Sequence, residues 1–337
     1  MKRTGTVTKN SPILVVGFGS IGQRHYRNLS VLGYRNVAVY DVDAKKLKDA
    51  GVRSVSSLTP ATLSQFDVVL ICNPTNLHVK TAHAALSAGC HVFIEKPLSH
   101  TSVGLMELKN IVTKSKRTAM VACNYRFNQG FVFLQDMLTK EKLGRAVSVR
   151  VAVGHDIAGS RKGVDYRKTY AANKKLGGGV ILDSGSHAFD YLTTLFGMIT
   201  RIHAEYGNIG PHPMNAEDYA SIDVRFASRV SASIVLDYFS VSKRHSVEVQ
   251  CERGMVKWDF PTNSVEWYDA KKGKLERKIF YKDKSKDEAR NDMYLRELGY
   301  FFNLIQKKKS AISDISHALA VTNSLLISKR QGKKIIK

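Results

Sequence analysis

The sequence predicts an α/β protein of two domains: an N-terminal doubly wound parallel sheet, then an α+β domain with a large, mostly antiparallel open sheet. Three observations lead to this prediction. Short apolar runs alternate with helical patterns up to about residue 125, and closely spaced β-rich runs follow. The chain has 337 residues, more than the roughly 100 to 200 typical of one domain. We place the domains at residues 11–125 and 126–337.

Five short apolar runs in the first domain are typical of buried strands. They occupy residues 13–16, 37–40, 68–72, 92–94 and 119–122. Between them, apolar residues recur at helical spacing in segments 21–32, 77–86 and 105–112. Because strands and helices alternate, we expect parallel pairing through right-handed crossovers.

In the second domain the predicted helices and strands no longer alternate. Helices are predicted at 130–138, 179–195, 294–307 and 315–329, and strands at 146–153, 219–226, 230–238 and 246–250. We expect helices to cover one face of the sheet, and the last helix to pack back towards the first domain. The polar segment 154–175 and the charged segment 271–290 are expected to form loops.

The charge balance is strongly basic, with 52 Lys and Arg against 29 Asp and Glu, a net +23. Such a surplus attracts polyanions. However, the basic residues are spread along the chain without a nucleic-acid-binding motif, so a solvated basic surface or a preference for anionic small molecules is favoured over nucleic acid. Apolar runs fall short of the roughly 18 to 20 residues of a membrane span, and no signal-peptide pattern opens the chain. We expect a cytoplasmic protein with no membrane partner.

A glycine-rich segment, G-F-G-S-I-G, follows the first predicted strand and opens the first predicted helix. Glycine clusters also make ordinary turns. In this context, however, they permit a tight turn, close approach of the backbone to a pyrophosphate and close helix packing. The segment therefore predicts a Rossmann-type dinucleotide site formed by Gly17, Phe18, Gly19, Ser20, Ile21 and Gly22.

Asp41 ends the second predicted strand. A carboxylate there accepts hydrogen bonds from the adenosine ribose hydroxyls and repels a 2′-phosphate, so NAD is favoured over NADP. Lys45 and Lys46 follow closely and would soften this preference.

Two further segments follow predicted strands, at the sheet edge where cofactor contacts gather. The first supplies Asn73, Pro74, Thr75 and His78; it is also compatible with a proline turn in which Thr75 or Asn76 caps the next helix. The second supplies Glu95 and Lys96. Taken alone, Lys96 would be a surface lysine, but partial burial at this edge would make it a proton donor or hydrogen-bond partner, oriented by Glu95.

Three consecutive glycines at 177–179 precede an apolar run, and we interpret them as a flexible start to a helix. Asp183 and His187 stand at i and i+4, so they share one face of that helix. An ordinary surface ion pair is the alternative. No third ligand lies at a characteristic spacing, so no metal site is predicted.

In this order, these motifs resemble the Gfo/Idh/MocA family of oxidoreductases, which includes glucose-fructose oxidoreductase and inositol dehydrogenase. The matching features are the glycine-rich segment with His25, the segment around His78, Glu95-Lys96-Pro97, and glycines 177–179 with Asp183 and His187. The resemblance implies hydride transfer between a nicotinamide and a sugar or polyol carbon. It also implies a catalytic group in which His187 takes the hydroxyl proton, Asp183 orients the substrate and Lys96 stabilises developing oxyanion character.

The segments 124–127 and 165–170 look like those that line the substrate pocket in relatives, although an exposed basic loop is the alternative. Through them we expect Asn124, Arg126, Tyr166 and Arg167 to join Asp183 and His187 in binding a sugar, sugar acid or nucleotide sugar. We also expect a homodimer or homotetramer formed through the C-terminal sheet. The rival hypothesis is a non-catalytic, NAD(P)-sensing regulatory protein of the same fold.

Overall fold

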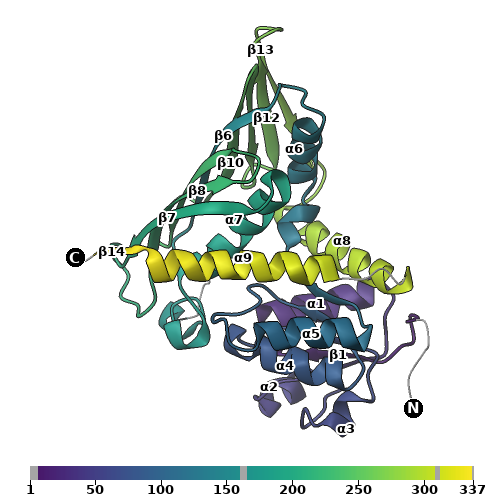
Figure 1. The fold of residues 1–337 in the computed structure, drawn as a ribbon. Coiled ribbons are helices and arrows are strands. Elements are labelled where there is room, and N and C mark those ends of the chain that lie inside the picture. Colours follow the sequence, from purple (N-terminus) through teal and green to yellow (C-terminus); the bar gives the residue numbers. More distant parts are fainter. Residues whose placement is uncertain (1–6, 160–164, 308–311, 336–337) are drawn as a thin grey trace. The chain divides into compact units, whose positions relative to one another are not determined.

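The computed structural model describes residues 7–159, 165–307 and 312–335, and the chain divides into two compact units (Figure 1). The first unit comprises Met1–Cys123 and Tyr294–Leu319, and the second comprises Asn124–Met293 and Ala320–Lys337. The helices α8 (Lys286–Gln306) and α9 (Ile312–Gln331) therefore each have residues in both units.

A five-stranded parallel sheet forms the centre of the first unit, in the order β2-β1-β3-β4-β5. Its strands are β1 (Ile13–Val16), β2 (Val37–Tyr40), β3 (Val68–Ile71), β4 (His91–Ile94) and β5 (Ala119–Val121). Nearly every strand residue is buried, as expected of a parallel sheet covered on both faces. Strand order reverses beside β1, and this is where open α/β sheets bind ligands at the carboxyl ends of their strands.

Helices flank this sheet (Figure 1). They are α1 (Ser20–Val31), α2 (Ala44–Asp49), α3 (Pro60–Leu63), α4 (Thr75–Ser87) and α5 (Leu105–Ser115). The core also takes in Ile315 and Leu319 from α9. The sequence prediction missed α2 and α3, because helices of 6 and 4 residues are too short to show an apolar period.

The second unit contains a nine-stranded sheet in the order β13-β12-β11-β10-β6-β9-β8-β7-β14. Its strands are β6 (Ala146–Gly154), β7 (Ile199–Gly207), β8 (Tyr219–Phe226), β9 (Ser231–Asp237), β10 (Arg244–Cys251), β11 (Gly254–Asp259), β12 (Ser264–Asp269), β13 (Lys274–Ile279) and β14 (Lys333–Ile335). Pairing is antiparallel except between β6 and β9 and between β14 and β7.

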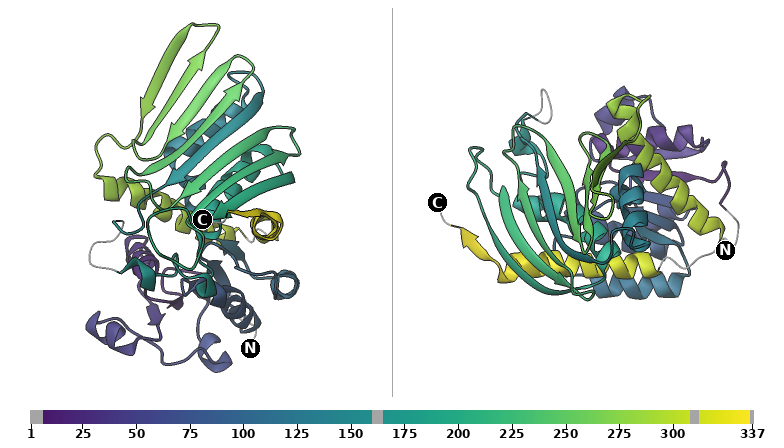
Figure 2. Two further views of the ribbon diagram at one scale, coloured as in Figure 1. Left: turned by 90° about the vertical axis from the view of Figure 1, so that its left-hand side faces the viewer. Right: turned by 90° about the horizontal axis from the view of Figure 1, so that it is seen from above.

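Two helices, α6 (Gln129–Thr139) and α7 (Val180–Phe196), pack on one face of this sheet. Figure 2 shows the sheet as a curved layer whose opposite face carries no helix. Burial alternates along β8, where Ala220, Ile222 and Val224 are buried and their neighbours are more exposed. This alternation is the pattern of a sheet packed on one face only.

The prediction of an exposed loop at 271–290 is wrong. Strand β13 pairs antiparallel with β12 inside this segment, and α8 begins at Lys286. β13 is one of the two edge strands of the sheet, and its charged side chains are typical of edges that resist further pairing. They obscured the strand pattern in the sequence. The polar segment 154–175 contains two short 3-10 turns, η2 (Tyr166–Lys168) and η3 (Lys174–Leu176), and its residues 160–164 lie outside the described part of the chain.

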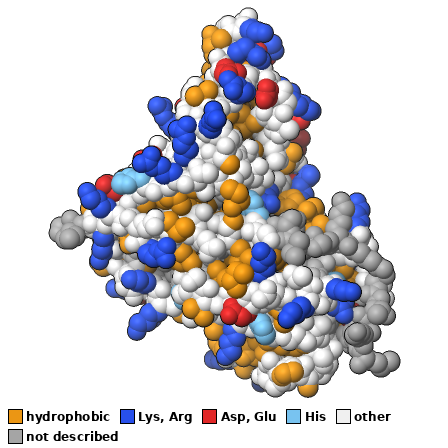
Figure 3. All heavy atoms as spheres, viewed as in Figure 1, with side chains coloured by type: hydrophobic (Ala, Val, Ile, Leu, Met, Phe, Trp, Pro, Cys, Tyr) orange, Lys and Arg blue, Asp and Glu red, His pale blue; other side chains and the backbone are white. Residues whose placement is uncertain are grey.

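Basic side chains are scattered over the face shown in Figure 3 and do not gather into one stripe. Among the described residues, no helix has the length and apolar character needed to cross a membrane. Within the same residues, His, Cys, Asp and Glu form no group of three that could hold a metal ion.

Candidate functional site

The glycine-rich turn joins β1 to α1 in the first unit. Gly17 has φ +94°, and a Cβ there would lie 2.5 Å from the Asn73 nitrogen. A Cβ on Gly22 would lie 1.9 Å from the Gly17 carbonyl oxygen. Gly19, in contrast, has no atom within 4 Å of where a Cβ would stand, and no side chain caps α1 behind it. The helix N-terminus therefore faces open space, as anion binding requires.

Asp41 is joined to this turn. Its Oδ2 accepts a hydrogen bond from the Phe18 N–H at 2.6 Å, and its Oδ1 accepts one from the Asp43 N–H at 3.0 Å. Burial raises the pKa of this carboxyl, but the two N–H donors and Lys46 outweigh it, so the net pKa is lowered. Asp41 is therefore an anion beside the turn.

A cavity of about 510 Å³ adjoins the same turn, with Phe18 and Gln23 in its lining. Three cations, Arg27, Lys45 and Lys46, and two carboxylates, Asp43 and Asp49, line it as well. The Lys46 ammonium lies 3.3 Å from Asp41 Oδ2.

The segment after β3 is fixed by its own contacts. The Asn73 side chain donates to the Thr81 hydroxyl at 3.0 Å. Helix α4 starts at Thr75 with Pro74 in the cap position and no side-chain cap, so the expected capping by Thr75 or Asn76 is wrong. His78 is 2% exposed, and its ring nitrogens lie 2.9 Å and 2.8 Å from the carbonyl oxygens of Pro97 and Asn73. The structure thus places His78 as a link between the loops after β3 and β4.

Glu95 follows β4 and is 7% exposed. Its Oε1 lies 2.6 Å from His25 Nε2, and its Oε2 accepts from the Lys96 N–H at 3.2 Å. Burial raises the pKa of Glu95, but His25 and the charge of Lys96 outweigh burial and lower it overall. Lys96 itself is half-buried. Glu95 therefore fixes the backbone from which the Lys96 side chain extends.

In the second unit, Asp183 and His187 both lie on α7, one turn apart, and both are half-buried. Dense packing explains the glycines before this helix. A Cβ on Gly178 would lie 2.1 Å from the Tyr170 carbonyl oxygen, and one on Gly179 would lie 2.3 Å from a Glu217 carboxylate oxygen. Gly178 and Gly179 therefore stand where a side chain would not fit.

Aromatic side chains contact both functional groups of α7. Asp183 accepts hydrogen bonds from the hydroxyls of Tyr170, to Oδ1, and Tyr238, to Oδ2. The ring centroids of His187 and Tyr125 are 4.6 Å apart, in an edge-to-face arrangement. Sequence reasoning missed the first pair of contacts, because Tyr238 stands at the end of a strand with nothing local to distinguish it.

The other predicted substrate residues have partners within the second unit. Arg126 forms a two-pronged pair with Asp190, with 2.7 Å from Nε to Oδ2. Arg167 pairs with Asp165 at 2.9 Å. The Asn124 amide lies 3.5 Å from the Met293 sulfur, and Asn124 is 5% exposed.

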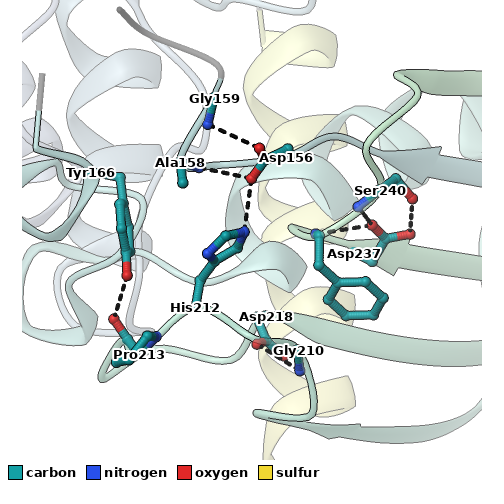
Figure 4. A network of polar contacts seen from close by, with 11 residues as sticks. Asp156, Ala158, Gly159, Tyr166, Gly210, His212, Pro213, Asp218, Asp237 and Ser240 are labelled. Carbon is teal, nitrogen blue, oxygen red and sulfur yellow. Dashed lines mark hydrogen bonds and ion pairs between the residues drawn. The ribbon is translucent and has the colours of Figure 1, made fainter. Parts of the chain in front are cut away.

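Tyr166 belongs to a network between two loops. Figure 4 shows its hydroxyl bound to the Pro213 carbonyl oxygen, at 3.1 Å. On the neighbouring stretch, His212 lies 2.8 Å from Asp156. The loop after β6 and the loop between β7 and β8 are thus joined by side chains.

The functional groups therefore form two sets, one in each unit. The parallel sheet, the glycine-rich turn and the anionic Asp41 define the first unit as a dinucleotide-binding Rossmann domain. Residues 12–123 match the model of an oxidoreductase family with an NAD-binding Rossmann fold, and residues 131–257 match the GFO/IDH/MocA C-terminal domain. The chain belongs to the Gfo/Idh/MocA family of oxidoreductases.

Individual relatives agree with this assignment. An inositol 2-dehydrogenase/D-chiro-inositol 3-dehydrogenase of Shouchella clausii is 32% identical over 146 residues, 40% of this chain and 42% of the relative. A levoglucosan dehydrogenase solved with NADH superposes with a TM-score of 0.81 at 17% identity, covering 96% of this chain and 97% of that one. A UDP-N-acetylglucosamine 3-dehydrogenase of Acidithiobacillus ferrooxidans superposes with a TM-score of 0.76 at 17% identity, covering 96% of this chain and 98% of that one. At these identities, the structural likeness is one of fold.

Proposed function

We propose that the protein is an NAD-dependent dehydrogenase that transfers hydride between a nicotinamide and a secondary hydroxyl or ketone of a sugar, sugar acid or nucleotide sugar. The observation that carries this proposal is the pair of half-buried groups on α7, Asp183 and His187, in a chain that also has a dinucleotide cradle. The relatives named above act on inositol, levoglucosan and UDP-N-acetylglucosamine. All three carry secondary hydroxyls, which supports this substrate class.

The residues of the first unit fit a nicotinamide dinucleotide. The space at Gly19 and the uncapped N-terminus of α1 suit the pyrophosphate, and the anionic Asp41 suits the ribose hydroxyls of NAD. When bound, the dinucleotide supplies the carbon that accepts or gives up the hydride. The cations Arg27, Lys45 and Lys46 in the lining of the cavity reduce the penalty for a 2′-phosphate, so we propose a preference for NAD and not an absolute exclusion of NADP.

Each proposed catalytic residue has a separate task. His187 takes the proton of the substrate hydroxyl as general base. Asp183 accepts a hydrogen bond from the substrate and orients it. The Lys96 ammonium stabilises negative charge that develops on the substrate oxygen, and its backbone is fixed by Glu95.

We also propose that subunits associate through the open face of the nine-stranded sheet. Small side chains surround Val235 on this face, where Ala152 and Ser221 are its partners on the two neighbouring strands. Val235 is 36% exposed beside them. Small residues at the centre of an uncovered sheet face let a second sheet approach closely.

Titration with NADH and NADPH, followed by cofactor fluorescence, tests the first half of the proposal. A panel of inositols, sugars, sugar acids and UDP-sugars is then assayed for turnover at 340 nm, roughly the absorbance maximum of the reduced cofactor. Tighter binding of NADH together with oxidation of one panel member is the expected result. Failure to bind either nucleotide would refute the proposal at its first step.

A further inference from the structure

Two tyrosines meet the Asp183 carboxylate, one at each oxygen. Tyr170 reaches Oδ1 from the loop before α7, and Tyr238 reaches Oδ2, at 2.8 Å, from the residue after β9. Both tyrosines lie in the second unit, Tyr170 13 residues before Asp183 and Tyr238 55 residues after it, and they converge on one carboxylate. Two donors on opposite oxygens fix both the position and the rotation of a carboxylate plane.

The Tyr238 hydroxyl is held in its donating form. Its side chain is 0% exposed. Burial raises the pKa of this phenol well above its ordinary value, and the negative charge of Asp183 raises it further. The other ionisable neighbours are His155, whose ring lies 5.2 Å from that of Tyr238, and Glu217, whose carboxylate faces Gly179 at the start of α7.

The position of Tyr170 depends on the course of its loop. Gly179 donates from its N–H to the Ala171 carbonyl oxygen at 2.9 Å, and Gly178 packs against the Tyr170 carbonyl with no space for a Cβ. Further along, the Lys174 N–H donates to the Asn215 side chain at 2.8 Å. Hydrogen bonds therefore hold the backbone that carries Tyr170 against the start of α7 and against the loop between β7 and β8.

We propose that Tyr170 and Tyr238 are positioning residues, which hold Asp183 as an oriented hydrogen-bond acceptor for the substrate hydroxyl. The inference rests on the proposed function and deepens it. A carboxylate that already accepts from two hydroxyls is a weaker proton acceptor than one in water alone. The two tyrosines thus separate the roles on α7: Asp183 orients the substrate, and His187 receives its proton.

The experiment compares Tyr170→Phe and Tyr238→Phe, each of which removes one hydroxyl and keeps the ring. Tyr281→Phe is the matched control, because the Tyr281 hydroxyl also donates to a carboxylate, that of Asp292, at 2.9 Å. The protonation of Asp183 is followed by infrared pH titration of protein labelled with carbon-13 aspartate, with Asp183→Asn identifying its band. Turnover of the substrate found in the panel is measured in parallel.

We expect the midpoint of the Asp183 protonation to move to higher pH by about one unit in each test variant, because the anion loses a hydrogen-bond donor. We expect kcat to fall about 10-fold, in line with the loss of a hydrogen bond to a charged group, without a change in the KM for the cofactor. Tyr281→Phe should leave both quantities at the wild-type values. If Tyr238→Phe does not fold, the result for Tyr170→Phe alone tests the proposal.

An unchanged midpoint in the test variants overturns the proposal, and so does a raised midpoint with wild-type kcat. The proposed function fails in a different way. If Asp183→Asn keeps full turnover, the catalytic role of Asp183 is refuted while the titration still reports whether the tyrosines hold it. The two failures are therefore distinguishable.

Discussion

His25 of α1 and Glu95, the residue after β4, form a buried pair in the first unit, with 2.6 Å between Nε2 and Oε1. The His25 side chain is 0% exposed, and that of Glu95 is 9% exposed. The second Glu95 oxygen accepts from the Lys96 N–H. The pair thus connects the helix of the glycine-rich turn to the backbone of the proposed catalytic lysine.

Glu95→Gln should destabilise the first unit by about 2 kcal/mol, because a buried hydrogen bond to a charged group is lost. The pKa of Glu95 is lowered on folding from its ordinary 4.5, since His25 and Lys96 outweigh burial. The ionised form therefore contributes stability that is complete above pH 4.5 and is lost as the pH falls through the lower folded-state value. The difference in stability between wild type and Glu95→Gln should therefore become smaller as the pH falls below 4.5.

Hydrogen exchange of peptides from β1 and β4 measures this difference, because both tryptophans lie in the second unit. Glu107→Gln, an exposed position on α5, is the control and should change exchange little. A difference in stability that does not depend on pH would contradict the ionisation of Glu95 in the folded protein.

Much of the fold could be predicted because its signals are local. The five parallel strands are short apolar runs, and α7 carries Asp183 and His187 at a spacing that any helix places on one face. The glycine-rich turn is also local, since Gly17 to Gly22 span a single connection. These elements are found in the structure where the sequence predicts them.

The rest depends on contacts between distant positions. His25 and Glu95 are 70 residues apart, and Asp183 and Tyr238 are 55 apart, so no pattern within one element pairs them. Arg126 shows the reverse case. The sequence predicts that it binds substrate, and the structure pairs it with Asp190, 64 residues away. A single sequence gives the residue type but not which distant side chain neutralises it.

Asp41→Asn should change the cofactor preference. The amide keeps an oxygen that can accept from the Phe18 N–H but loses the negative charge that repels a 2′-phosphate. With Lys45 and Lys46 retained, the ratio of the NADPH and NADH dissociation constants should fall about 10-fold, as expected for one lost charge repulsion in a partly solvated site. Fluorescence titration measures both constants. Asp49→Asn, which removes a carboxylate from the wall of the neighbouring cavity, should leave the ratio unchanged; an equal effect in both variants would show that Asp41 has no special role.

Lys96→Met and His187→Asn should each reduce kcat by about 100-fold to 10,000-fold, the range for removing a positioned acid–base or oxyanion-stabilising group. NADH binding should remain within about 3-fold of wild type, because the cradle residues are intact. Steady-state kinetics and NADH titration give the two quantities. His83→Asn, an exposed histidine on α4, is the control. Full turnover in both test variants would refute the catalytic assignment.

Val235→Glu should dissociate the proposed oligomer, because a charge placed on the open face of the sheet would be buried without a partner at a subunit contact. Sedimentation velocity measures the change in mass. Val103→Glu is the control, since Val103 is 78% exposed and belongs to the first unit, whereas the sheet belongs to the second. A wild-type monomer, or an oligomer unaffected by Val235→Glu, would exclude this face as the contact.

Gly179→Ala and Gly299→Ala should have opposite effects on stability. Gly179 has φ +108°, and its Cβ would lie 2.3 Å from a Glu217 oxygen. Glu217 has little freedom to move away, because its carboxylate is buried and paired with Lys329 at 2.9 Å. For Gly179→Ala we expect the free energy of unfolding to fall by about 3 kcal/mol, and turnover to fall because Asp183 is displaced.

Gly299 lies within α8, with nothing within 4 Å of a Cβ, so alanine there should stabilise the helix by about 1 kcal/mol. Scanning calorimetry measures both changes, and a tolerated alanine at Gly179 would mean that the start of α7 is less constrained than its packing indicates.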